Sequence, residues 1–271
     1  MIIHNKYLVL NQINQGSFGT IYKGINTLTC NYVAIKTEPI KGQLSLLKNE
    51  TKIYNLLNGN IGIPSVKWFG KDDKNYFMVL DLLGLSLQEI IKDTCKMPLL
   101  LVLKIGIKII HILNILHDKG FVHRDIKPHN FLLNKYMNQI FIVDLGFCKN
   151  YMINGIHNKI KNTHNIIGSK NYASIMAHRH IELSRRDDLE SLGYMLIFLC
   201  NGFLEWNNID DEQEILLLKE NVIYKKNDPT YPDVLLDFMK YVRLINYDEA
   251  PNYCLIIDKF IEKIKKIENE K

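Results

Sequence analysis

The sequence predicts an α+β fold of two lobes, in which a small antiparallel sheet with one helix precedes a larger, mainly helical lobe. Strand-like runs separated by turn residues occupy positions 7 to 36, and an apolar strand at 76 to 80 runs into a short connector. From Leu99 to His117 apolar residues recur at helical spacing, and the segment 254 to 271 has one apolar face. We expect these two helices to pack in the core of the larger lobe.

Length and composition limit the class of protein. With 47% hydrophobic residues, the chain can bury a substantial core, and we expect one domain, 1–271, divided into a small lobe at 1–83 and a large lobe at 84–271. The net charge of +5, with Lys and Arg scattered among Asp and Glu, argues against a nucleic-acid-binding protein. The frequent Asn, Ile and Lys are typical of an AT-rich genome, such as that of a large virus or of some protists.

Cysteine usage and hydropathy predict the compartment. The five cysteines are odd in number, lie far apart and form no C-x-x-C pair, so neither a disulfide framework nor a zinc site is expected. No uninterrupted apolar run reaches about 18 residues, and the amino terminus does not read as a signal sequence. We expect a soluble, monomeric protein of the cytoplasm, without a membrane anchor, that can also reach the nucleus or act in the cytoplasm of a host cell.

The stretch from Phe121 to Leu133 has the layout of a catalytic loop, with the pattern H-R-D-x-K-x-x-N. Asp125, Lys127 and Asn130 stand at short, fixed spacing, and apolar residues on both sides can anchor the polar loop in a core. A carboxylate can accept a proton from a hydroxyl, an amine can contact an anionic group, and an amide oxygen can bind a metal ion. The pattern therefore predicts a catalytic site in this loop.

A glycine-rich stretch, Asn14 to Gly19, lies between the first two predicted strands. Because glycine carries no side chain, the backbone N–H groups of such a turn can approach phosphate oxygens closely. An ordinary hairpin turn is an equally compatible interpretation of this stretch alone. The stretch indicates phosphate binding only in combination with the charged residues that follow it.

Three charged residues extend the candidate site. Lys36 ends a V-A-I-K strand, and Glu50 lies in the middle of a predicted helix, 44–57, from which it can pair with the Lys36 amine. Solvated surface positions are the alternative for both residues. Asp144 ends the apolar strand 140–143 and is followed by Leu-Gly, a place from which a carboxylate can hold magnesium.

These motifs together resemble those of protein kinases, and two further stretches narrow the resemblance. Most protein kinases carry A-P-E later in the chain. Here Y-A-S-I at 172–175 and S-R-R-D-D-L-E-S-L-G-Y at 184–194 are similar to the casein kinase 1 family instead. The resemblance implies the bilobal protein-kinase fold, ATP and Mg²⁺ as cofactors, and transfer of the γ-phosphate to Ser or Thr hydroxyls of protein substrates. Other stretches similar to that family are 16–22, 62–64, 82–87 and 123–132.

The resemblance also implies roles for individual residues. Asp125 is the expected base, Lys127 the expected contact of the transferred phosphate, and Asn130 and Asp144 the expected magnesium ligands. Asp188 resembles the buried aspartate with which kinases brace the catalytic loop, and a helix N-cap is the alternative for it. The expected nucleotide-binding residues are Asn14, Gly16, Ser17, Gly19, Ile21, Ala34, Lys36, Glu50, Leu80, Asp81, Leu83, Leu133 and Asp144.

The chain departs from the kinase pattern at three positions. Asn14 stands at the first glycine of G-x-G-x-x-G, and Leu145 replaces the phenylalanine of D-F-G. Asn171 stands where casein kinase 1 relatives usually have an arginine that binds acidic or phosphorylated substrates, with Lys170 beside it as a substitute. Because acidic residues follow at 210–214, we expect reduced dependence on a phosphorylated priming residue.

Regulation and rival functions can also be judged from the sequence. Thr163 and Ser169 offer hydroxyls in the segment 144–182, but no charge switch is evident there, so we expect constitutive activity. A pseudokinase that acts as a scaffold is the main alternative, favoured by Asn14 and Leu145, although the lysine, the base and the metal aspartate are all present. A small-molecule phosphotransferase shares the metal chemistry but does not share the S-R-R-D-D-L-E-S-L-G run.

Overall fold

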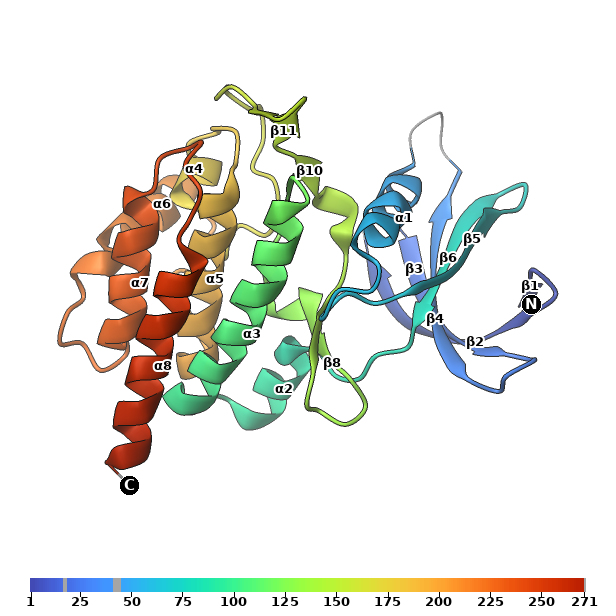
Figure 1. Cartoon of the computed structure of the whole chain (residues 1–271), viewed down its shortest axis with the longest axis horizontal. Coiled ribbons are helices and arrows are strands. Elements are labelled where there is room, and N and C mark those ends of the chain that lie inside the picture. Colours follow the sequence, from blue (N-terminus) through green and yellow to red (C-terminus); the bar gives the residue numbers. More distant parts are fainter. Residues whose placement is uncertain (17–18, 41–44, 271) are drawn as a thin grey trace. The chain divides into compact units, whose positions relative to one another are not determined.

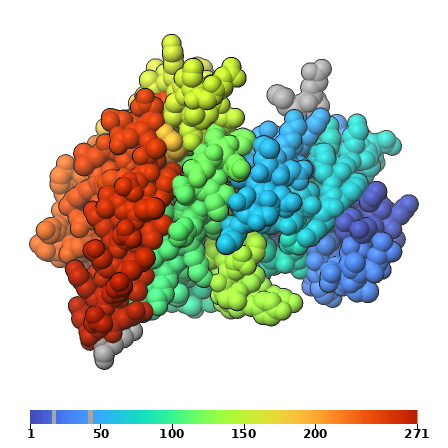
Figure 2. All heavy atoms as spheres, viewed as in Figure 1, coloured from blue at the N-terminus to red at the C-terminus, as the bar shows by residue number. Residues whose placement is uncertain are grey.

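The computed structural model describes residues 1–16, 19–40 and 45–270 (Figures 1 and 2). Its secondary structure confirms the predicted α+β fold, because an antiparallel sheet occupies the N-terminal region and helices dominate the rest of the chain. Ser17, expected in the phosphate-binding turn, and Leu44, expected at the start of a helix, lie outside the described residues.

Internal contacts divide the chain into two compact units. The first unit comprises residues 1–85 together with 132–147, and the second comprises 86–131 together with 148–271. The segment 132–147, which the sequence suggested would belong to the large lobe, therefore groups with the N-terminal unit. The reason is backbone pairing, which is described below for this segment.

The first unit is built on a six-stranded antiparallel sheet in the order β1-β2-β3-β4-β6-β5. Consecutive strands are neighbours except at β4, which pairs with β6. The strands are β1 (Ile2–Ile3), β2 (Tyr7–Gly16), β3 (Gly19–Asn26), β4 (Tyr32–Pro39), β5 (Val66–Lys71) and β6 (Asn75–Asp81).

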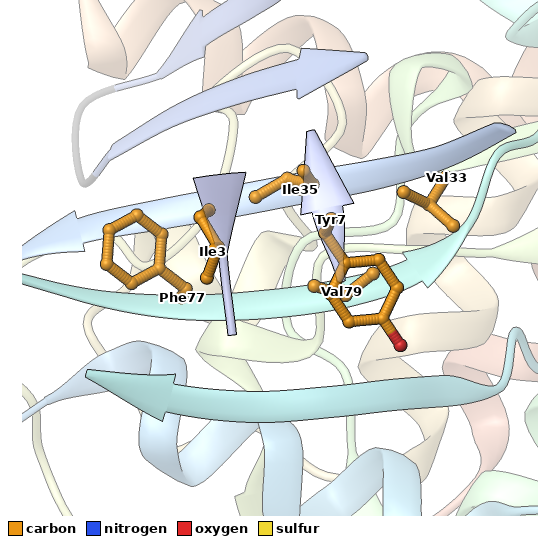
Figure 3. Close-up of a cluster of buried hydrophobic side chains, with 6 residues drawn as sticks. All are labelled: Ile3, Tyr7, Val33, Ile35, Phe77 and Val79. Atoms are coloured by element: carbon orange, nitrogen blue, oxygen red, sulfur yellow. The ribbon is translucent and has the colours of Figure 1, made fainter. Parts of the chain in front are cut away.

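The two faces of this sheet carry different residues, because successive side chains of a strand point to opposite sides. One face holds a buried apolar cluster, in which side chains from β1, β2, β4 and β6 pack together (Figure 3). The other face carries Lys36 and Met78, which oppose each other in the register of β4 and β6. The residues of the apolar cluster are Ile3, Tyr7, Val33, Ile35, Phe77 and Val79.

Helix α1 (Leu46–Leu57) packs on β4, β5 and β6. Its first turn is tied to β4 through Glu38, whose carboxylate accepts hydrogen bonds from the Leu46 amide at 3.1 Å and from the Leu47 amide at 2.6 Å. The negative charge of Glu38 at the N-terminus of α1 also interacts favourably with the positive end of the helix dipole. These contacts fix the height of α1 on the sheet, and with it the position of Glu50.

The hairpin of β8 (Phe131–Leu133) and β9 (Ile140–Ile142) continues the first unit. The Leu133 amide donates to the carbonyl of Leu85 at 2.9 Å, and the Leu133 carbonyl accepts from the Gly84 amide at 2.7 Å. These backbone bonds explain why the hairpin groups with the connector after β6.

The second unit is mainly helical. α3 contacts α5 and α8, while α7 contacts both α5 and α8, and Figure 1 shows these four helices side by side. The predicted C-terminal helix therefore packs on the core through its apolar face. The helices are α2 (Leu87–Thr94), α3 (Leu99–Asp118), α4 (Ile175–His178), α5 (Arg185–Asn201), α6 (Glu212–Asn221), α7 (Asp233–Leu244) and α8 (Tyr253–Asn269).

Within the described residues, α3 is long and apolar enough to cross a membrane by length and composition alone. A core helix passes the same test. Val102, Ile109 and Leu113 of α3 are fully buried, and the helix lies against α5 and α8. Its apolar character therefore has a sufficient cause in packing within the protein.

Candidate active site

The predicted catalytic loop lies between two short elements of the second unit. β7 (Phe121–Val122) precedes it, and the 3-10 turn η1 (Pro128–Asn130) ends it. β7 pairs with β10 (Lys149–Asn150), so the chain that follows residue 147 starts beside the entry to the loop. Asp125 lies between these elements and is buried, with 3% of its surface exposed.

Asp188 of α5 supports the backbone of this loop. Its carboxylate accepts hydrogen bonds from the amide of His123 at 2.7 Å and from the amide of Arg124 at 2.8 Å. The His117 ring lies 2.9 Å from the same carboxylate and bonds Tyr253 with its other nitrogen. Burial would raise the pKa of Asp188, but these partners lower it, so the carboxylate stays charged beneath the loop.

Asp187, and not Asp188, occupies the start of α5 as a capping residue. It accepts hydrogen bonds from the Ser174 hydroxyl at 2.6 Å and from the Ser184 amide at 2.8 Å. Burial raises the pKa of Asp187 to about 7, although both hydrogen bonds act in the opposite direction. Of the two interpretations of Asp188, a brace and a cap, the structure shows the brace.

Both oxygens of the Asp125 carboxylate are engaged. Oδ1 accepts from the backbone amide of Ser169 at 2.9 Å and from its hydroxyl at 3.0 Å. Oδ2 accepts from the Lys127 amine at 2.6 Å and from the Asn130 amide at 3.3 Å. The Lys127 amine lies 3.1 Å from the Ser169 hydroxyl, so four groups converge on one carboxylate. The structure thus brings together Asp125, Lys127 and Asn130 as predicted, and it adds Ser169.

The backbone approaches closely where the Ser169 segment meets the loop. Gly168 has a φ of +91°, and a Cβ added there would lie 2.4 Å from the carbonyl oxygen of Arg124. Only glycine fits such a position, because any side chain would collide with the loop and the dihedral angle is strained for L residues. Arg124 itself has a φ of 70°, an uncommon value for a residue other than glycine.

Lys36, Glu50 and Asp144 meet in the first unit. The Lys36 amine donates to Glu50 Oε2 at 2.8 Å and to Asp144 Oδ1 at 2.7 Å. Burial would lower the pKa of Lys36, but the two carboxylates outweigh it and raise the pKa, so the amine stays protonated. Glu50 is 2% exposed, whereas the side chain of Asp144 is 38% exposed and remains accessible.

Asp144 is held by the backbone after β9 in an uncommon conformation, with a φ of 63°. Its amide donates to the Tyr54 hydroxyl of α1 at 3.1 Å. Leu145, which stands where kinases have phenylalanine, is fully buried in a turn that packs on α1. A strained residue persists only where its surroundings hold it, and such positions gather at functional sites.

The predicted nucleotide-binding residues of the sheet share one face. Ile21 opposes Lys36, Ala34 opposes Leu80, and Gly16 opposes Gly19 in the strand registers. Asn14 lies on the same face, two residues before Gly16. Gly19 also allows β3 to approach β4, since a Cβ there would lie 1.8 Å from the Thr37 carbonyl oxygen.

Two other predicted residues have different surroundings. The Asp81 carboxylate accepts from the Ser65 amide at 3.1 Å and pairs with Lys67 at 2.8 Å, so its side chain faces β5. Leu133 lies beside the connector that contains Leu83, through the backbone bonds of β8 already described. A cavity of the first unit is lined by Lys36, Glu50 and Asp144, together with other residues of β4, of α1 and of the turn after Asp144.

Each of the two expected magnesium ligands carries an oxygen of the kind that this ion binds. Within the described residues, no three His, Cys, Asp or Glu side chains gather as a metal site. Magnesium usually needs only one or two protein oxygens, since water and phosphate oxygens complete its shell. Asp144 offers an accessible carboxylate, and both hydrogen bonds of Asn130 are donated by its amide nitrogen, which leaves the amide oxygen outside them.

Sequence reasoning missed one residue of this site and one charged cluster. The sequence presents Ser169 only as a hydroxyl of the segment 144–182, although its place after Gly168 indicates a tight turn. Glu182, which is 4% exposed, pairs with Lys149 at 2.7 Å and lies 4.0 Å from Arg124. No local motif marks Glu182, because its partners are distant in sequence.

Comparison with protein families agrees with this geometry. The family model described as the protein kinase domain matches residues 7–254, which is most of the chain. The match includes both the loop of Asp125 and the residues around Lys36. The chain therefore belongs to the protein kinase family.

Proposed function

We propose that this kinase transfers the γ-phosphate of Mg-ATP to serine and threonine hydroxyls of proteins, in the manner of casein kinase 1. The observation that carries the proposal is the Asp125 carboxylate, oriented by Lys127, Ser169 and Asn130. A general base must be oriented toward the hydroxyl whose proton it accepts, and these contacts hold the carboxylate in one orientation. Protein kinases as a family use ATP and Mg²⁺, and the donor set described above fits them.

Each residue has a defined task in this mechanism. Asp125 accepts the proton of the substrate hydroxyl, and Lys127 carries a positive charge beside it. Asp144 and Asn130 are the residues that would hold magnesium, and the ion would supply positive charge to the phosphate oxygens of ATP. Lys36 binds phosphate oxygens, and Glu50 keeps its amine in place. The protein thus aligns the reactants and neutralises charge.

The likeness to casein kinase 1 is supported by the structural use of its characteristic run. Arg185 lies 4.7 Å from the Tyr151 ring centre, and Arg186 donates to the Ile245 carbonyl at 2.7 Å. Glu190 pairs with Arg243 at 3.2 Å, and Asp188 supports the catalytic loop. Each of these charged residues has a partner in the second unit, which supports a structural role for the run.

An assay of phosphate incorporation tests the proposal. Purified protein is incubated with γ-labelled ATP, Mg²⁺ and casein, beside the Asp144→Ala variant, and the labelled amino acids are identified after hydrolysis. We expect phosphoserine and phosphothreonine with the wild type and loss of label with the variant. No label with either protein would instead support a scaffolding pseudokinase, and equal label with both would contradict the role proposed for Asp144. Label on small alcohols but not on casein would support a small-molecule phosphotransferase.

Reduced dependence on primed substrates belongs to the same proposal. Lys170, the expected substitute for the missing arginine, donates to Asp210 at 3.0 Å and to the Ile209 carbonyl at 3.2 Å. An amine that already has a carboxylate partner attracts a substrate phosphate less strongly. Rates on matched peptides with and without a phosphorylated residue test this, and a strong preference for the phosphorylated peptide contradicts it.

Activity without prior phosphorylation also follows from the proposal. Glu182 places a buried carboxylate among Arg124, Lys149 and Lys161, at 4.0, 2.7 and 3.8 Å respectively. In many kinases a phosphorylated residue orders the activation segment through such basic groups. Here a carboxylate of the chain itself supplies the negative charge. Protein treated with phosphatase should therefore keep its full rate on casein.

A further inference from the structure

Lys219 of α6 is a fully buried lysine, with 0% of its surface exposed. Its amine donates to the carbonyls of Lys170 and Ala173, each at 2.7 Å, and lies 3.0 Å from the His178 ring. The faces of two aromatic rings, Tyr194 and Trp206, lie 4.9 and 5.4 Å from it. No carboxylate of the described residues lies within ion-pair distance of this amine.

A lysine in such a place is costly to the fold. Burial lowers the pKa of Lys219 well below its usual value, because the charged form loses its water. The nearby carboxylate of Glu190 is already bonded to Arg243 and to the Tyr194 hydroxyl. An apolar side chain would fill the same space without this penalty. What it could not replace are the hydrogen bonds of the Lys219 amine.

The two hydrogen bonds to carbonyls end on one turn, which we call the 169–173 turn. The amides of Tyr172 and Ala173 both donate to the Ser169 carbonyl at 2.9 Å and close the turn. Besides the two carbonyls bound by Lys219, the carbonyl of Asn171 accepts from the Trp206 indole at 2.7 Å. The side chains of Lys219 and Trp206 thus bind three carbonyls of this five-residue turn.

The first residue of the turn is the one that contacts Asp125. Ser169 donates its amide and its hydroxyl to the carboxylate, so a shift of the turn shifts both donors. A displacement of about 1 Å in a positioning group can lower a rate by as much as ~10²-fold. The path from the Lys219 amine to the Asp125 carboxylate contains only the turn itself.

We propose that Lys219 is a positioning residue, which clamps the 169–173 turn and thereby holds Ser169 on the catalytic carboxylate. Lys219 touches no reacting atom and acts only through the turn. Trp206 is the second part of the same clamp, through its bond to the Asn171 carbonyl. This inference rests on the proposed function, because the effect on rate assumes that Asp125 is the base.

A double-mutant cycle on casein phosphorylation tests the path. We expect Ser169→Ala and Lys219→Met each to lower kcat by about tenfold with an unchanged KM for ATP. The double variant should be slower than Ser169→Ala by no more than about threefold, because Lys219 then acts through the Ser169 amide alone. Independent effects that multiply in the double variant, or an equal loss in both kcat and ATP affinity, overturn the inference. Lys225→Met, which removes a lysine bonded to Glu205 and not to the turn, is the control and should keep the wild-type kcat.

Two further measurements keep the test decisive if Lys219→Met does not fold. Trp206→Phe removes only the indole donor, and its cycle with Ser169→Ala should show the same lack of additivity. Amide exchange of Tyr172 and Ala173 reports the turn directly and needs no catalysis. We expect exchange at least about fivefold faster in Lys219→Met or Trp206→Phe, because the turn opens more often.

The exchange measurement also separates this inference from the proposed function. Unchanged exchange in both variants overturns the clamp, whatever the activity of the wild type. Faster exchange in a protein that never phosphorylates casein supports the clamp and counts against the proposed function alone.

Discussion

Ser169 donates both its backbone amide and its hydroxyl to one oxygen of Asp125, at 2.9 and 3.0 Å. The other oxygen of that carboxylate is held by Lys127 and Asn130. Four donors around one carboxylate hold it in one orientation, which suits the proposed role of Asp125 as the base. The hydroxyl of Ser169 also accepts from Lys127, so Ser169 contacts both charged residues of the predicted catalytic loop.

The first prediction concerns this hydroxyl. Ser169→Ala should lower kcat by about tenfold, because the carboxylate keeps the amide bond but loses the hydroxyl and Lys127 loses a partner. Ser169→Thr keeps the hydroxyl and should stay within about threefold of the wild type. Steady-state rates on casein at saturating ATP provide the measurement. Equal losses in both variants would show that size, and not the hydroxyl, matters at this position.

The second prediction concerns Asp125 itself. Asp125→Asn keeps the shape of the side chain but removes the proton acceptor, so turnover should fall by ~10²–10⁴-fold. Binding of Mg-ATP, measured by the shift it causes in the melting temperature, should be retained. A variant with near-normal turnover would remove Asp125 from the role of base.

The third prediction concerns the pairing of Lys36. Among the described residues, Glu50→Gln leaves Asp144 as the only charged partner of the Lys36 amine, so the amine competes more strongly for the expected metal ligand. We expect kcat/KM for ATP to fall by roughly 10- to 100-fold and the Mg²⁺ concentration needed for half-maximal rate to rise. Lys52→Gln, on the exposed side of the same helix, is the control. An unchanged Mg²⁺ dependence in Glu50→Gln speaks against this pairing.

The fourth prediction concerns pH and the buried Asp187. Its pKa is raised from 3.8 to about 7 in the folded protein, so the native state binds this proton more tightly than the unfolded state does. Stability from this group is therefore complete below about pH 4 and is lost as the pH rises to about 7. Asp187→Asn should remain neutral throughout. Unfolding free energies of both proteins between pH 5 and 8 should show the wild type losing stability relative to the variant as the pH rises, and parallel curves contradict this.

Much of the fold could be predicted from periodicity and turn residues. Strands around Tyr7, Tyr32 and Tyr76 and the long helix after Leu99 were expected and are present, since each has a strong local pattern. Helix α2 was not predicted, because its eight residues give few turns over which a period can show. Helix α6 was missed for another reason, since its burial pattern includes a lysine, Lys219, in place of an apolar residue.

Residues of the site that lie in short sequence motifs could be predicted. Residues whose contacts depend on long-range packing were missed. Lys36 and Glu50 were expected to pair, and they do at 2.8 Å, because a strand end and a helix middle are easily recognised. The contacts of Ser169 and Glu182 depend on how the 145–182 segment folds back on the catalytic loop. This segment has little regular secondary structure, so its sequence has no hydrophobic periodicity from which its course through the fold could be predicted.

The alternation of β4 between its two faces has a practical consequence for saturation mutagenesis. Val33 and Ile35 belong to the apolar cluster, whereas Ala34 and Lys36 face the other way, so adjacent codons report on different properties. Polar replacements at 33 and 35 should reduce the amount of folded protein in cells, while the specific rate of what remains stays high. Replacements at Lys36 should leave abundance closer to normal and abolish phosphorylation of casein, so abundance and activity should alternate from one position to the next along β4.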